Sequence, residues 1–198
     1  MTKTFISIFL LFTFHTFTTM AIGQTEKQKY RIVHSEKEFE IRFYPSTTLA
    51  TVYSSANSYK EVSGSGFRKL AGYIFGGNEE DVKISMTAPV HMDINDSGSS
   101  MSFVMPSAYH MGNLPKPDDS GVKLKTTEDE YVAAVTFKGY ASDKQIKSYS
   151  QKLGRLLDNQ GIPYSGNFRF LGYNPPYQLF GRRNEVIVSV KWQEKRGD

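Results

Sequence analysis

The stretch Ser142-Asp143-Lys144-Gln145 opens the clearest helical pattern in this 198-residue chain. Its serine and glutamine have the spacing of a capping box, which satisfies free backbone N–H groups at a helix start. The residues that follow place one apolar face at helical spacing: Ile146, Tyr149, Leu153, Leu156 and Leu157. Gly161 and then Pro163 stop the pattern, because proline cannot continue a helix. The stretch therefore predicts a helix over Ser142 to Asn159.

Strand segments are predicted on both sides of this helix. Two precede it and two follow it, around Val122 to Lys125, Tyr131 to Phe137, Asn167 to Tyr173 and Glu185 to Trp192. The second half of the chain thus has the order strand, strand, helix, strand, strand.

The first half repeats that order. Glu38 to Ser54 alternates as two strands around a turn at Tyr44-Pro45-Ser46. Ser58 to Phe75 has a second capping box and an apolar stripe, and predicts the other main helix. Val82 to Met92 and Met101 to Met105 are the next two strand segments. Because identity between the halves is slight, the repeat lies in the order of elements, and it predicts a duplicated α+β unit around a pseudo-twofold axis.

Two unusual segments carry a resemblance to a known family. They are Lys83-Ile84-Ser85-Met86-Thr87-Ala88-Pro89-Val90 and Gly172-Tyr173-Asn174-Pro175-Pro176-Tyr177, the latter running on to Gly181-Arg182-Arg183-Asn184-Glu185-Val186. The chain resembles the SOUL haem-binding proteins from about Tyr30 to Val190. The resemblance implies a curved antiparallel sheet or distorted β-barrel, with one helix from each half packed against it. It also implies binding of haem or another tetrapyrrole, although family membership indicates architecture more firmly than chemistry.

The N-terminus has the pattern of a secretory signal peptide. Lys3 precedes an apolar run from Phe5 to Phe17, and Ala21-Ile22-Gly23 supplies small residues for cleavage. The run is shorter than the roughly 20 apolar residues of a membrane-spanning helix. We expect residues 1–23 to be a signal peptide, residues 24–198 to form a single domain, and the product to be soluble and exported, either periplasmic or secreted.

Composition removes several function classes. The chain contains no cysteine, which excludes disulfides, thiolate ligation of iron and covalent haem attachment through cysteine. The formal net charge of +4 comes from interspersed acidic and basic residues and is too mild to suggest nucleic-acid binding.

The histidines and carboxylates of the chain form no recognisable catalytic pattern. His34, His91 and His110 follow the predicted signal peptide without metal-ligand spacing, and the carboxylate runs resemble exposed loop ends. The sequence therefore predicts a binding protein and no enzyme.

A haem site needs an apolar wall and a few cations at its rim. Phe67, Leu70 and Tyr73 on the first helix are candidates for one wall, with Tyr173, Pro175 and Pro176 as a stiff rim opposite. Candidate partners of the propionates are Arg68, Lys69, Arg182 and Arg183, because arginine pairs with a carboxylate through two hydrogen bonds. Each set also has a structural interpretation: the helix residues as core, the prolines as a turn, and the two arginines as partners of Glu185.

An axial ligand is not evident. Some SOUL proteins carry a histidine after a Glu-x-Arg in the second strand region, where this chain has Phe43. His91 and His110 are the weak candidates that remain, with His34 as a third. We therefore expect a haem or tetrapyrrole cofactor bound largely by hydrophobic contact, with little or no axial ligation.

The leading interpretation is an exported protein that holds a tetrapyrrole in a surface cleft for buffering, carriage or scavenging. The alternative is a sensor or sequestering module for hydrophobic cations, because effector-binding modules have a similar duplicated architecture. A protein-interaction module that uses the proline-containing loops is a third possibility.

Overall fold

The computed structural model describes residues 25–95 and 98–194, so the predicted signal peptide lies outside the described residues. Both predicted helices are present, as α1 (Tyr59–Ile74) and α2 (Asp143–Asn159). Each begins at the predicted serine cap: the Ser58 hydroxyl accepts the N–H of Glu61, and the Ser142 hydroxyl accepts the N–H of Gln145. The local capping patterns were therefore sufficient to locate both helix starts.

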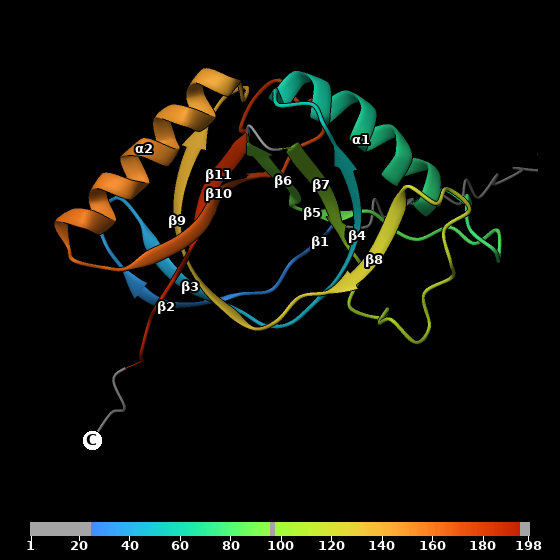
Figure 1. Cartoon of the computed structure of the whole chain (residues 1–198), viewed down its shortest axis with the longest axis horizontal. Helices are drawn as coiled ribbons and strands as arrows, with labels where there is room; N and C mark the ends of the chain where they lie inside the picture. Colours follow the sequence, from blue (N-terminus) through green and yellow to red (C-terminus); the bar gives the residue numbers. More distant parts are fainter. Residues whose placement is uncertain (1–24, 96–97, 195–198) are drawn as a thin grey trace, which may run out of the picture.

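The strands form one large antiparallel sheet (Figure 1). Its members are β2 (Arg31–Ser35), β3 (Glu40–Tyr44), β4 (Thr48–Ser54), β6 (Val90–Asn95), β7 (Gly98–Val104), β8 (Val122–Thr126), β9 (Glu130–Lys138), β10 (Tyr164–Gly172) and β11 (Arg183–Val190). The order in this nine-stranded sheet is β2-β3-β9-β11-β10-β6-β7-β4-β8. Two further strands, β1 (Glu26–Lys27) and β5 (Thr87–Ala88), pair in parallel as a separate small sheet.

The strand order confirms the duplicated unit. The first half supplies β3, β4, α1, β6 and β7, and the second supplies β8, β9, α2, β10 and β11. If each strand is replaced by its counterpart in the other half, the sheet order from β3 to β8 becomes the same order read backwards. The pseudo-twofold axis therefore passes between the neighbouring strands β6 and β10. The first strand of each half pairs with a strand of the other half.

The sheet is curved but does not close into a barrel. Its two ends are β2 and β8, which do not pair with each other. Both are short, and β8 carries exposed lysines, as is common for strands that must resist further pairing. Of the two forms implied by the family resemblance, the open curved sheet is the one that occurs.

One predicted strand is divided. Val82 to Met92 was expected to be continuous, but it contains the short β5 and the beginning of β6, with Pro89 between them after a cis peptide bond. Proline has no N–H to give to a strand ladder, so the pairing changes partner there.

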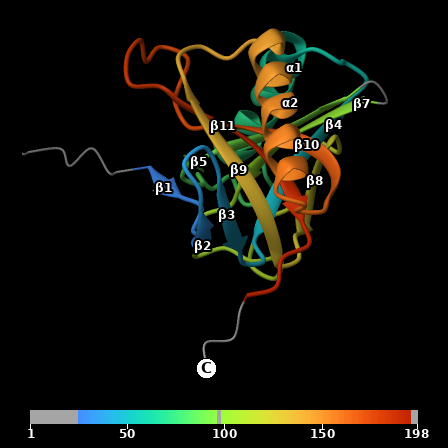
Figure 2. The same cartoon turned by 90° about the vertical axis from the view of Figure 1, so that its left-hand side faces the viewer.

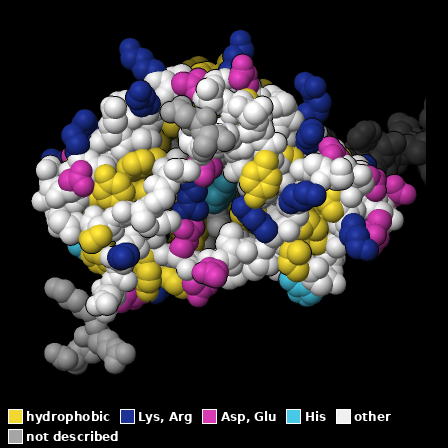
Figure 3. Space-filling view, in the orientation of Figure 1, with side chains coloured by type: hydrophobic (Ala, Val, Ile, Leu, Met, Phe, Trp, Pro, Cys, Tyr) yellow, Lys and Arg dark blue, Asp and Glu magenta, His cyan; other side chains and the backbone are white. Residues whose placement is uncertain are grey.

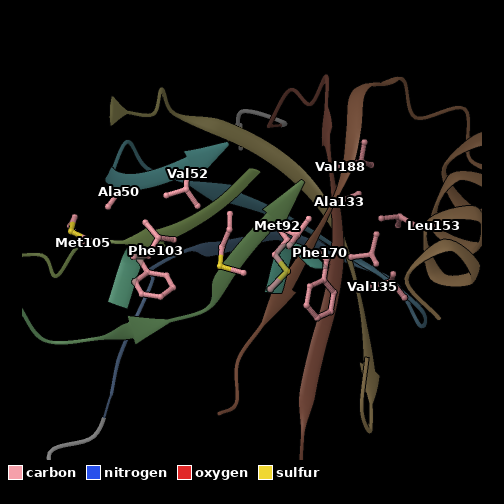
Figure 4. Close-up of a cluster of buried hydrophobic side chains, with 14 of the residues drawn as sticks. Ala50, Val52, Met92, Phe103, Met105, Ala133, Val135, Leu153, Phe170 and Val188 are labelled. Carbon is pink, nitrogen blue, oxygen red and sulfur yellow. The ribbon is translucent and has the colours of Figure 1, made fainter. Parts of the chain in front are cut away.

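Both helices cover the same face of the sheet (Figure 1). Leu70 of α1 and Leu153 of α2 are fully buried in the main core, which Figure 4 shows in part with Phe103 and Phe170. The helix α1 approaches β4 and β7 closely at Gly66, where an added Cβ would lie 3.2 Å from the Cβ of Met101. A larger residue at this position would push the helix away from the sheet.

The opposite face of the sheet is partly covered by the N-terminal strap, which we define as residues 25–30. Pairing of β1 with β5 anchors one end of the strap. At the other end, the Tyr30 ring lies 5.2 Å from the Tyr44 ring and 4.3 Å from the Arg42 guanidinium. This covering allows charged side chains to be buried on the face away from the helices.

Candidate functional site

The connection between β10 and β11 is the most exposed apolar feature that the described residues offer. Residues 173–182, here called the apical loop, project away from the sheet (Figure 2). The exposed fractions are 82% for Tyr177, 66% for Leu179 and 85% for Phe180. Large apolar side chains that gather on one exposed loop commonly mark a binding surface.

Arg182 holds the apical loop in its shape. Only 7% of this residue is exposed, and its guanidinium donates hydrogen bonds to the carbonyls of Pro175 at 2.7 Å and Gln178 at 3.0 Å. It also lies 4.5 Å from the centre of the Tyr140 ring. The sequence analysis offered Arg182 as a partner for propionates, but the structure turns its donors toward the loop backbone. Its direct role is therefore to position the loop.

Asparagine and glutamine side chains make further hydrogen bonds that fix the conformation of the apical loop. The Asn174 carbonyl oxygen accepts the N–H of Arg183 at 2.6 Å, and its amide donates to Gln178 at 2.9 Å. The Gln178 amide in turn donates to the Phe180 carbonyl at 2.9 Å. The exposed side chains of Tyr177, Leu179 and Phe180 are thus carried by a backbone that the polar side chains of the loop hold in place.

The residues at the base of the apical loop donate hydrogen bonds to a buried carboxylate. Glu185 is fully buried and accepts hydrogen bonds from Arg42 at 2.8 and 3.0 Å, from Arg183 at 2.6 and 3.0 Å, and from the Tyr173 hydroxyl at 2.8 Å. Burial alone would raise the pKa of Glu185, but the hydrogen bonds and charges of Arg42 and Arg183 outweigh it and lower the pKa. The pKa of Tyr173 is raised, chiefly by burial and by the charge of Glu185. The carboxylate therefore stays ionised and the phenol stays neutral.

The two loop arginines predicted to pair with propionates, Arg182 and Arg183, differ in their exposure to solvent. The Arg183 side chain keeps about 37% of its surface exposed while it pairs with Glu185. It lies beside exposed Lys138, its neighbour on β9. A partly exposed arginine next to an exposed lysine can still meet an anion at the rim.

The starts of both helices lie close to the apical loop. The Tyr59 ring packs edge-on against Phe170 of β10, and Tyr140 precedes α2 and stacks with Arg182. Asp143 accepts the N–H of Tyr59 at 2.6 Å, which joins the two helix starts. The sequence analysis did not select Tyr59 or Tyr140, because their proximity depends on contacts between distant segments.

The predicted wall on α1 divides into buried and exposed parts. Leu70 and Tyr73 are buried in the main core, and the Tyr73 hydroxyl donates to the Pro115 carbonyl at 2.9 Å. Phe67 is partly exposed and packs edge-on against Phe103, while Arg68 and Lys69 are exposed. Leu70 and Tyr73 therefore act as the core residues of the amphipathic helix, and Phe67, Arg68 and Lys69 form its outer surface.

None of the three histidine candidates belongs to the apical loop, although His91 of β6 pairs with Leu171 of β10, two residues before it. The ring of His91 is hydrogen-bonded to Gln28 at 2.7 Å, and burial, aided by Arg169 and Lys125, lowers its pKa to about 3. His110 is exposed and its Nδ1 accepts the N–H of Gly112 at 3.0 Å. Within residues 25–95 and 98–194, no three histidine or acidic side chains gather as a metal site. His34 pairs with Glu36 and lies against Trp192.

Two general features concern the surface charge and the helices. Acidic and basic side chains are interspersed on the face seen in Figure 3. Neither described helix is long and apolar enough to cross a bilayer.

Solved structures support the fold. The C-terminal domain of EcmrR has a TM-score of 0.57 and 10% identity, covering 82% of this chain and 98% of the domain. A hydrolase from Listeria innocua has a TM-score of 0.53 and 10% identity, covering 79% of this chain and 93% of that one. At such low identity, these similarities establish architecture alone.

Sequence comparison is more specific. Heme-binding protein 2 of Mus musculus is 31% identical over 161 residues, which cover 77% of this chain and 78% of the relative. Heme-binding protein 1 of the same species is 30% identical over 156 residues, covering 75% and 82%. A family model described as SOUL heme-binding protein matches residues 25–189. The chain therefore belongs to the SOUL heme-binding protein family.

Proposed function

We propose that this protein binds haem or a related tetrapyrrole on the surface formed by the apical loop and the adjoining helix starts. The observation that carries the proposal is the display of Tyr177, Leu179 and Phe180 on a braced loop. Family membership supplies the ligand class, since the mouse relatives are named as heme-binding proteins.

The exposed chemistry fits a tetrapyrrole. When bound, haem supplies a flat apolar ring, two propionates and an iron centre. Tyr177 and Phe180 offer apolar surface for the ring, and Tyr173, Pro175 and Pro176 shape the base of the loop. Arg183 and Lys138 are the loop-side cations for propionates. Phe67 and Arg68 form the outer wall of α1 farther from the loop, and the Lys69 ammonium lies beside Gly121, before β8. Leu70 and Tyr73 support this wall from the core beneath.

Axial ligation by histidine has little support at this surface. The imidazole of His91 is half-buried and bonded to Gln28, and the Nδ1 atom of His110 already accepts a backbone N–H. Hydrophobic contact is then the main source of affinity, so the protein tolerates porphyrins with and without iron.

The proposed role is a non-enzymatic one in an exported protein: buffering, carriage or scavenging of the tetrapyrrole. An open surface exchanges its ligand more readily than an enclosed pocket would. The signal-peptide pattern of residues 1–23 supports export.

Capture of a hydrophobic cation is less favoured. Such a site places a carboxylate against the ligand, and Glu185, the buried carboxylate nearest the loop root, is already neutralised by Arg42 and Arg183. Separating Glu185 from the arginines would leave buried Arg42 with only the partly exposed Glu40 as an ion-pair partner, which is costly.

A matched pair of phenylalanine variants tests the location. Phe180→Ser removes a loop tip, whereas Phe75→Ser removes a similarly exposed ring at the far end of α1. Titration with haemin, followed by the Soret absorbance, should show at least tenfold weaker binding for Phe180→Ser and parental binding for Phe75→Ser. Equal binding by both folded variants would place the haem elsewhere, and an absence of saturable binding by the parent would reject the proposed function.

A further inference from the structure

A cavity of about 540 Å³ lies apart from the apical loop. Its walls come from the N-terminal strap, the β3–β4 turn and the turn that follows β7. Among the described residues, its lining includes nothing from either helix or from the apical loop. The volume lies within the roughly 300–1,000 Å³ of small-molecule sites. The cavity is thus large enough for a ligand that does not share the proposed haem surface.

The strap wall is fixed by hydrogen bonds that need no ligand. The Glu26 carboxylate accepts the N–H of Ser107 at 3.0 Å. Gln28 donates its N–H to the Ala88 carbonyl at 2.8 Å, and its side chain is bonded to His91 at 2.7 Å. The strap therefore forms a preorganised wall.

The two other walls are fixed in the same way. In the β3–β4 turn, Ser46 donates its N–H to Asp129 at 2.6 Å and its hydroxyl to the Thr127 carbonyl at 2.7 Å. In the turn after β7, Asn113 accepts the N–H of His110 at 2.7 Å and donates to the Ala108 carbonyl at 3.0 Å. A ligand would enter a cavity that already exists, and would not have to order these turns.

The charged groups around the cavity favour an anion. Lys27 and Lys29 both line it, and neither has an ion-pair partner among the described residues. The one carboxylate in the described lining, Glu26, already accepts a backbone N–H. Because Nδ1 of His110 accepts the Gly112 N–H, the proton of its neutral ring lies on Nε2, which is then a donor. The described lining of the cavity therefore has more cations than anions, two lysines against one carboxylate, with the His110 N–H as a further donor.

The remaining lining provides apolar contact. Pro45, Met105 and Met111 border the same space, together with the ring of Tyr109. Methionine adapts its shape to varied ligands, because its side chain is unbranched and polarisable. These residues suit the carbon skeleton of a small molecule better than an inorganic ion.

We propose that this cavity is a second binding site, which takes a small organic carboxylate. Lys27 and Lys29 pair with the carboxylate, and Met111 and Pro45 contact the apolar body. The site is independent of the haem surface in location and in the residues that it uses.

A pair of fluorescent probes tests the proposal. Pyrenebutyrate and 1-pyrenebutanol share an apolar body and differ in the carboxylate. Fluorescence titration of the protein should give at least tenfold tighter binding of pyrenebutyrate. The Lys27→Gln/Lys29→Gln double variant should lose that preference, whereas Lys144→Gln/Lys147→Gln, which removes equal charge from α2, should retain it. Met111→Glu should prevent binding by placing a like charge in the cavity.

Phe180→Ser distinguishes this site from the haem surface. It should leave pyrenebutyrate binding unchanged while it weakens haemin binding. The proposal is overturned if the two probes bind equally or not at all, if the strap double variant retains the preference, or if Phe180→Ser abolishes probe binding. None of these results depends on whether haem binds at the apical loop.

Discussion

At the scale of single residues, two arginines with consecutive numbers have different tasks. Arg183 pairs with buried Glu185 and remains partly exposed, whereas Arg182 is turned inward to the loop carbonyls. The sequence could suggest that both were cations near a rim. It could not separate them, because the difference depends on the path of the loop. The second partner of Glu185, Arg42, lies 143 positions away in the chain, so no local pattern revealed that pair.

Glu185→Gln should lower the free energy of unfolding by about 3 kcal/mol, because buried Arg42 then keeps only the partly exposed Glu40 as its counter-ion. Glu130→Gln, at the more exposed pair with Arg169, is the control and should cost about 1 kcal/mol or less. The lowered pKa of Glu185 adds stability above its unfolded value near 4.5, and this contribution is lost as the pH falls. Urea unfolding at several pH values should therefore show the difference between parent and Glu185→Gln narrowing below about pH 4.5. A constant difference down to pH 2 would contradict this account.

Arg182→Ala should weaken binding of both haemin and an esterified porphyrin, because the loop loses the donor that fixes its carbonyls. Lys138→Ala removes the exposed cation beside Arg183 and should weaken haemin alone, by about 1 kcal/mol. Parallel titrations with the two porphyrins measure the difference. If Arg182→Ala affects haemin alone, the guanidinium contacts propionates and does not brace the loop.

At the scale of elements, helix starts were predictable and loop conformation was not. Ser58 and Ser142 reach backbone groups three residues away, so their capping function is visible in a short stretch of sequence. The brace made by Asn174, Gln178 and Arg182 is almost as local, but these residue types do not specify a turn by their spacing. The division of the α1 residues into core and outer surface followed from helical periodicity, whereas the proximity of Tyr59 and Tyr140 to the apical loop did not.

Asp143 links the two helix starts, because its carboxylate accepts the N–H of Tyr59 at the beginning of α1. Asp143→Ala should accelerate hydrogen exchange at the Tyr59 amide and destabilise the protein by about 1 kcal/mol, the usual scale for a lost cap. Lys144→Ala, one position later, should change neither quantity appreciably. The expected readout is amide exchange followed by NMR. Unchanged exchange at Tyr59 in the aspartate variant would show that the two helix starts are independent.

At the scale of the whole molecule, duplication accounts for the sheet and the strap accounts for the buried charge. The two halves repeat an order of elements that was legible in the sequence, although their exchange of first strands required the structure. The strap was not predicted to cover the face opposite the helices. Its partners lie in β3, β5 and β6, and only tertiary structure brings these segments together.

Export should leave a mature protein that begins at Gln24, one residue before the strap. The apolar run of residues 5–17 and the small residues at 21–23 are the basis of this expectation. Mass spectrometry of the protein from its native source gives the N-terminal peptide directly. Recovery of peptides that contain Lys3 from the mature pool would contradict it.

The central claim is that a surface without an axial histidine binds the tetrapyrrole by hydrophobic contact. Side-by-side titration of the protein with haemin and iron-free protoporphyrin tests this most directly. The account predicts saturable binding of both ligands with dissociation constants within about tenfold, a difference of no more than roughly 1.4 kcal/mol. A much larger preference for haemin, abolished by His91→Ala or His110→Ala, would contradict it and identify the histidine that coordinates the iron.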